Sequence, residues 1–102
     1  MQARTVIDKI RSREALLRHL GVAGICLFGS VARGDDNDAS DIDLAIRFDP
    51  ENRPRGLAYV GRLEEVSETL EQLLERPVDV VVEPTAGTVL QRAIDEDRVV
   101  AF

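Results

Sequence analysis

The sequence has few of the cysteines and long apolar segments that disulfides, membrane spans and secretory leaders require. Its one cysteine, Cys26, excludes an internal disulfide, and we expect it to be a small buried strand residue in a reducing cytoplasm. No apolar run approaches the ~18 residues of a membrane span. The amino terminus lacks the apolar segment of a signal peptide. We therefore expect a cytoplasmic protein with no membrane association.

Positive charge is also scarce, because the net charge is −6 and is unevenly spread. Residues 1–34 contain six basic and two acidic side chains, whereas residues 35–102 contain seven basic and seventeen acidic ones. A chain this acidic is a poor candidate for direct binding of a nucleic-acid backbone. We expect its partners to be magnesium, a metal-bound nucleotide or a basic protein surface.

Composition and periodicity indicate a small globular α/β (α+β) protein. Hydrophobic residues make up 44% of the chain and charged residues 31%, and we expect residues 1–102 to form a single domain. Periodicity predicts helices at 4–20, 30–33, 55–75 and 85–97, and strands at 22–28, 41–48, 77–82 and 99–102. The longest helix has an apolar stripe from Leu57 and Val60 to Leu74. The expected fold is a small mixed β-sheet of three or four strands flanked by helices.

The most informative stretch is residues 27–44, where a polar loop separates two apolar strands. Side chains alternate along a strand, so Asp41 and Asp43 point the same way, with Cα atoms about 6.7 Å apart. Two carboxylates ~4 Å apart repel by about 4 kcal/mol at an effective dielectric of ~20. A bound cation attracts both carboxylates and so offsets their repulsion. Mg²⁺ often binds one or two carboxylates together with substrate phosphates. The pair therefore predicts a metal site.

The other half of this stretch predicts a site for phosphate. The strand over 22–28 is followed by Gly29 and Ser30 just before a short helix, which leaves backbone N–H groups free to hold an anion. Arg33 is a further phosphate-binding candidate, with anchoring of the acidic loop as the structural alternative. The acids of that loop are expected to be loop charges rather than ligands, since no strand period fixes them: Asp35, Asp36 and Asp38.

A third carboxylate, Asp79, enters early in the strand over 77–82, as Asp41 does in the strand over 41–48. If these two strands and the helix between them form a right-handed parallel unit, Asp79 and the aspartate pair lie at the same end of the sheet. The strand over 22–28 must then run antiparallel, because its far end carries Gly29. Only that topology brings these elements together.

The same residues resemble a known signature. Gly29-Ser30, ten intervening residues and Asp41-Ile42-Asp43 are similar to the signature of the DNA polymerase β-like nucleotidyltransferase superfamily. Segments 29–34 and 40–44 resemble its small prokaryotic branch, the minimal nucleotidyltransferases (MNT). The resemblance implies a polymerase β-like palm in which Gly29 and Ser30 hold the triphosphate of ATP. It also implies that Asp41 and Asp43 coordinate Mg²⁺, as two ions, while Asp79 completes the metal site or takes the acceptor's hydroxyl proton.

The resemblance also suggests a biological role. Minimal members resemble the antitoxin half of MNT–HEPN pairs, in which the nucleotidyltransferase adds AMP to a tyrosine of a helical ribonuclease toxin. It thus implies a Mg²⁺-dependent nucleotidyltransferase that uses ATP and acts as the antitoxin of a cognate HEPN toxin. Two alternatives stay open: an antitoxin that acts by contact alone, and a stand-alone small-molecule nucleotidyltransferase of the aminoglycoside type. The second needs an acceptor pocket, which the sequence does not reveal. Homo-oligomerisation also stays open.

Overall fold

The computed structural model describes residues 1–35, 37 and 39–102. Two of the acids expected to be loop charges, Asp36 and Asp38, lie outside the described residues. The elements in chain order are α1 (Ala3–Arg11), α2 (Glu14–His19), β1 (Val22–Phe28), α3 (Gly29–Arg33), β2 (Ile42–Phe48), the 3-10 turn η1 (Pro50–Asn52), α4 (Leu57–Leu74), β3 (Val78–Val82), α5 (Thr88–Asp97) and β4 (Val99–Val100).

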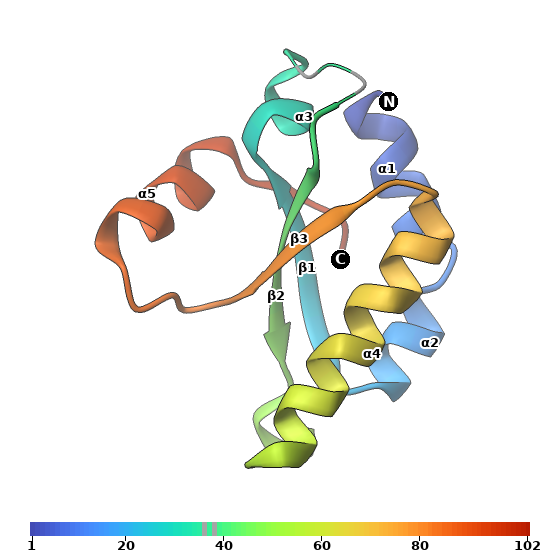
Figure 1. Ribbon diagram of the computed structural model, residues 1–102, viewed down its shortest axis with the longest axis vertical. Helices are drawn as coiled ribbons and strands as arrows, with labels where there is room; N and C mark the ends of the chain where they lie inside the picture. Colours follow the sequence, from blue (N-terminus) through green and yellow to red (C-terminus); the bar gives the residue numbers. More distant parts are fainter. Residues whose placement is uncertain (36, 38) are drawn as a thin grey trace.

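The four strands form one mixed sheet in the order β3-β2-β1-β4. β1 pairs antiparallel with β2 and with β4, while β2 and β3 are parallel. Helix α4 makes the crossover between the two parallel strands, as Figure 1 shows. The predicted fold class and the predicted strand directions are confirmed.

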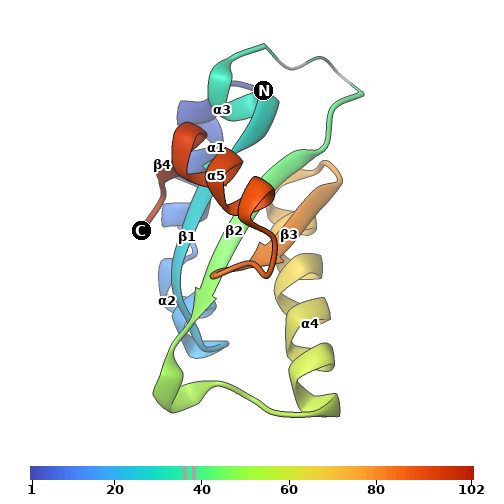
Figure 2. The same cartoon turned by 90° about the vertical axis from the view of Figure 1, so that its left-hand side faces the viewer.

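The two faces of the sheet are covered unequally. Helices α1, α2 and α4 cover one face and enclose the main core (Figures 1 and 2). Fully buried core side chains of this face include Val6, Ile10, Leu17, Leu27, Leu44, Ile46, Val66, Leu70 and Leu74. The other face carries a small cluster in which Ile94 of α5 packs with Cys26, Phe28 and Ala45. Cys26 is a buried free thiol, as expected for a small strand residue.

The helix predicted over residues 4–20 is two helices, so that prediction was wrong at its middle. The chain turns between α1 and α2, where Arg13 N donates to Ile10 O and the Ser12 hydroxyl donates to Lys9 O. Serine hydroxyls compete with the helix for backbone groups. None of residues 11–14 is buried, so no core contact holds this segment helical. The break lets both helices place their apolar residues on the same sheet face.

The apolar stripe of α4 is buried only over its second half. Val66, Leu70 and Leu74 are fully buried, whereas Leu57 is 91% exposed and Val60 is 52% exposed. Figure 1 shows the reason, because the first turns of α4 extend past the end of the sheet beside η1. Periodicity identifies the residues that share a helix face, but it does not show how far the sheet reaches beneath them. Within the described part of the chain, no helix is both long and apolar enough to cross a membrane.

Candidate active site

The ends of three adjacent strands meet at one end of the sheet. The last residue of β1, Phe28, is the cross-strand partner of Asp43 on β2. Because β2 and β3 are parallel and in register, Asp43 is also the partner of Asp79 on β3. The structure therefore places Asp79 of β3 beside Asp43 of β2, at the sheet end where the sequence predicted it.

The turn after β1 lies against the same aspartates. Gly29 and Ser30 begin α3 directly after Phe28, and Asp41 immediately precedes β2. An ideal Cβ built on Gly29 would lie 2.2 Å from Asp43 Oδ2, and the backbone φ of Gly29 is +77°. Glycine is therefore required here for two reasons, the left-handed backbone and the close approach of the carboxylate. The missing side chain lets the Asp43 carboxylate lie directly against the Gly29 backbone.

The carboxylates repel one another. Partial burial raises the pKa of Asp43 above its ordinary value, and the charges of Asp79 and then Asp41 raise it further. The positive charge of Arg33 acts in the opposite direction on the pKa of Asp43. Asp41 and Asp79 are exposed, whereas Asp43 is half-buried. The like-charge cost that the sequence predicted is thus centred on Asp43.

The donor set formed by Asp41, Asp43 and Asp79 suits a hard divalent cation. Among residues 1–35, 37 and 39–102, no three histidine, cysteine or acidic side chains lie together in an arrangement that could hold a metal ion. Three mutually repelling carboxylates without a thiol or imidazole ligand are nevertheless the oxygen donors that Mg²⁺ prefers. Mg²⁺ typically takes its remaining ligands from water and substrate phosphates. The residues present therefore fit a magnesium–nucleotide complex.

Arg33 occupies the structural role that the sequence left open. Its Nε lies 3.2 Å from Asp35 Oδ2, and its Nη1 lies 2.7 Å from Asp97 Oδ2 on α5. These ion pairs tie α3 to α5 and to the start of the following loop. Asp97 was given no role by the sequence, because no motif links it to α3 across 64 positions.

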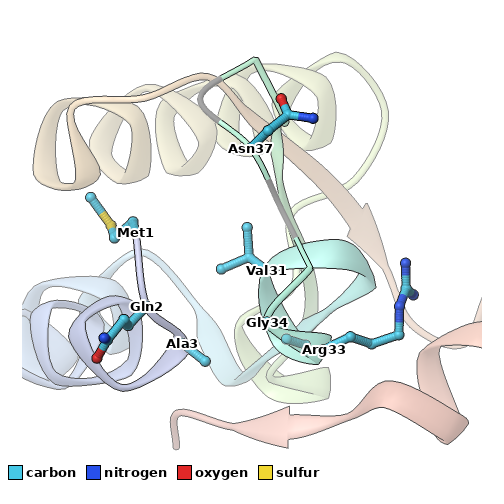
Figure 3. Close-up of a pocket in the computed structure, with 8 residues that line it drawn as sticks. Met1, Gln2, Ala3, Val31, Arg33, Gly34 and Asn37 are labelled. Carbon is cyan, nitrogen blue, oxygen red and sulfur yellow. The ribbon is translucent and has the colours of Figure 1, made fainter.

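A cavity of about 380 Å³ lies on the other side of α3, between this helix and the start of α1 (Figure 3). Val31 points into it, whereas Arg33 points away toward α5. Its lining includes Met1, Gln2 and Asn37 and none of the three candidate aspartates. The site at the strand ends is therefore a separate surface from this cavity.

Comparison with known proteins decides the family. The chain matches the nucleotidyltransferase domain family over residues 9–101. It belongs to this family. The nucleotidyltransferase is 35% identical over 79 residues to "Putative protein adenylyltransferase MJ1379" of Methanocaldococcus jannaschii, covering 76% of this chain and 75% of that protein. It is 33% identical over 87 residues to "Protein adenylyltransferase MntA" of Thermococcus cleftensis, covering 80% of this chain and 82% of that protein.

Solved structures agree with this assignment. The nucleotidyltransferase resembles a "putative minimal nucleotidyltransferase" with a TM-score of 0.74 and 27% identity, over 97% of this chain and 95% of the other. It resembles a chain of a toxin–antitoxin complex with AMP-PNP (TM-score 0.65, 27% identity, 94% of this chain and 72% of the other). A third likeness is to a chain of the structure described as tri-AMPylated Shewanella oneidensis HEPN toxin in complex with MNT antitoxin (TM-score 0.59, 25% identity, 97% of this chain and 71% of the other). The predicted resemblance to minimal nucleotidyltransferases and the predicted enzyme class are confirmed.

Proposed function

We propose that this nucleotidyltransferase is an antitoxin that transfers AMP from ATP to a tyrosine of a cognate helical HEPN toxin. The observation that carries the proposal is the meeting of Gly29 with Asp43 and Asp79 at one sheet end, which joins the turn after β1 to the carboxylates. The relatives support the choice of nucleotide and acceptor, since two are named protein adenylyltransferases and one structural neighbour contains an AMPylated toxin.

The proposed reaction is an in-line displacement at the α-phosphorus of ATP. The tyrosine oxygen forms a bond to that phosphorus, and the bond from phosphorus to the oxygen bridging to the β-phosphate breaks. Pyrophosphate leaves with the electron pair of that bond, and the phenolic proton goes to Asp79 or to water. The products are the toxin with AMP on its tyrosine, pyrophosphate and one proton.

Each residue of the site has its own role in this reaction. The Gly29–Ser30 turn binds the triphosphate through backbone N–H groups at the start of α3, and the Ser30 hydroxyl is an additional donor. Magnesium would be held by Asp41 and Asp43 together with Asp79, and the sequence-based prediction is that two ions bind. Bound Mg²⁺ supplies the positive charge that stabilises the phosphate oxygens in the transition state. Arg33 stays a candidate for phosphate binding only if its ion pair with Asp35 or with Asp97 breaks and the guanidinium binds a phosphate of the nucleotide instead.

Intact-mass spectrometry of the toxin tests the proposal. The toxin, the nucleotidyltransferase, ATP and magnesium are incubated together, and each transferred group adds the mass of one AMP to the toxin. The modification should persist after the two proteins are separated and should silence the toxin. Asp43→Ala is the matched control. It leaves the protein surface outside the site unchanged, so the variant should bind the toxin without modifying it.

The alternative of an antitoxin that acts by contact alone makes the opposite prediction. Neutralisation of the toxin without added mass, in the presence of ATP and magnesium, would overturn the enzymatic proposal. Transfer of label from α-labelled ATP separates the two mechanisms independently, since contact alone transfers nothing. A small-molecule nucleotidyltransferase would instead label free acceptors in the absence of any toxin.

A further inference from the structure

Arg76 is a side chain outside the motifs that reaches the active-site loop. It lies between the end of α4 and the start of β3, three residues before Asp79. Its guanidinium Nη2 donates to the carbonyl oxygen of Asn37 at 3.2 Å and to the carbonyl oxygen of Ser40. Ser40 immediately precedes Asp41. One side chain thus joins the segment that leads into Asp79 to the segment that leads into Asp41.

The two carbonyls belong to a turn with its own hydrogen bonds. Asn37 N donates to Ser40 Oγ at 3.1 Å, and Ser40 N donates back to Asn37 O at 3.0 Å. The Asn37 side chain also accepts from Ala39 N at 2.8 Å. These bonds hold the Asn37 carbonyl oxygen in place beside Ser40, so the guanidinium binds a turn that is already formed.

The backbone on the other side of Asp41 is fixed to the same neighbour. Ile42 N donates to Pro77 O at 3.1 Å, which is where the pairing of β2 with the segment before β3 begins. Asp41 is therefore flanked by two links to residues 76–77, one through the Ser40 carbonyl and one through the Ile42 amide. Asp41 itself is exposed and is not part of a strand, so these links define where its backbone lies.

We propose that Arg76 is a positioning residue that sets the place of Asp41 relative to Asp79, and so the geometry of the carboxylate cluster. The inference rests on the proposed function for its catalytic consequence. Both bonds come from Nη2, whose N–H directions are fixed by the planar guanidinium, whereas a lysine ammonium is a compact point charge on a flexible stem. A displacement of about 1 Å at a reacting group can reduce a rate by roughly 100-fold. Loss of the link is therefore expected to affect turnover more than nucleotide binding.

The test compares Arg76→Ala and Arg76→Lys with the unmodified protein. Arg55→Ala is the matched control, since Arg55 is an exposed arginine before the opposite end of α4. For Arg76→Ala we expect kcat for AMP transfer to fall by about 10- to 100-fold. The KM for ATP should stay within about threefold, because the Gly29–Ser30 turn is unaltered. The magnesium concentration for half-maximal activity should rise, and Arg76→Lys should lie between the two.

These readouts separate positioning from simple stabilisation. A structural role would lower the melting temperature without changing the magnesium dependence of the folded fraction. Equal kcat and equal magnesium dependence in Arg76→Ala and Arg55→Ala would overturn the inference. If Arg76→Ala does not fold, the same measurements on Arg76→Lys decide it, and turnover and magnesium dependence like those of the unmodified protein overturn it.

A second measurement tests the role of Arg76 independently of the proposed AMP transfer. If the unmodified protein adds no AMP to the toxin, the proposed function fails, and the magnesium-induced rise in melting temperature tests Arg76 alone. We expect magnesium to stabilise the unmodified protein and to stabilise Arg76→Ala less at the same concentration. An equal rise in both proteins, or no rise in either, overturns the inference.

Discussion

At the scale of single residues, the active site is destabilised by the same charges that suit it to magnesium. Asp43 is half-buried between Asp41 and Asp79, and burial and then these charges raise its pKa above 3.8. Folding therefore favours the protonated form of Asp43. The resulting cost is small at low pH and grows as pH rises from the unfolded-state pKa through the raised folded-state pKa.

Asp43→Asn should therefore raise the melting temperature of the metal-free protein at neutral pH, while abolishing AMP transfer. The gain should shrink as pH falls toward about 3, because Asp43 of the unmodified protein is then neutral in both states. Calorimetric melting between about pH 3 and pH 8, with and without magnesium, measures this. Magnesium should stabilise the unmodified protein more than the variant. A lower melting temperature in the variant at neutral pH would mean that the carboxylate makes stabilising hydrogen bonds instead.

Gly29→Ala should destabilise the fold and abolish ATP binding. Its new Cβ would lie 2.2 Å from Asp43 Oδ2 on a backbone with φ of +77°. We expect a loss of about 1–3 kcal/mol in the free energy of unfolding, measured with urea. Ser30→Ala is the comparison, because it should weaken ATP binding in calorimetry with little change in stability. Wild-type ATP affinity in both variants would refute the assignment of the turn to phosphate.

At the scale of elements, the two halves of α4 do different things. Leu70 is fully buried against the sheet, whereas Leu57 is 91% exposed on the turn that extends past it. The second half of the helix stabilises the core, and it ends just before Arg76, which contacts the active-site loop.

Leu70→Ala should therefore cost about 2–5 kcal/mol of unfolding free energy. Leu57→Ser should change it by no more than about 0.5 kcal/mol. Chemical denaturation of both variants checks this difference. Comparable losses in the two would show that the first turns of α4 are covered in solution.

The strand register is what made most of the site readable from the sequence. Alternation predicted that Asp41 and Asp43 share a face, and the directions of β1, β2 and β3 follow from requiring Gly29 and Asp79 to meet them. Contacts through side chains from distant segments could not be read in this way. Arg76 and Asp97 carry no motif, and their partners are fixed only once α4 and α5 are packed. The exposure of Leu57 likewise depends on where the sheet ends, and the break at Ser12 on which residues the core covers.

At the scale of the whole molecule, the candidate site is open rather than enclosed. It lies at an end of the sheet where Asp41 and Asp79 are exposed, and the cavity of about 380 Å³ beside α3 does not include them. Positioned reactants reach effective molarities of ~10⁵–10⁸ M, and an open site cannot supply that advantage to a freely tumbling acceptor. A bound protein can supply it by presenting its own hydroxyl group.

We therefore expect efficient transfer of AMP to the toxin and little or none to free tyrosine, small alcohols or aminoglycosides. Label from α-labelled ATP, counted after separation of protein from small molecules, measures both. Comparable rates with the toxin and with a small acceptor would contradict this expectation and favour a stand-alone transferase.

The alkylation rate of the single cysteine, Cys26, would measure how often α5 separates from the sheet. Cys26 is only 3% exposed and packs with Ile94, and its Sγ lies 3.4 Å from Arg98 Nη1. Burial raises the pKa of this thiol, with Glu83 adding to the effect and Arg98 opposing it, so the closed protein should resist alkylation. A thiol reagent would then react at the rate at which the helix lifts from the sheet. Because Asp97 of that helix is paired with Arg33, the alkylation rate measured with and without ATP would report how firmly α5 holds α3 in each case.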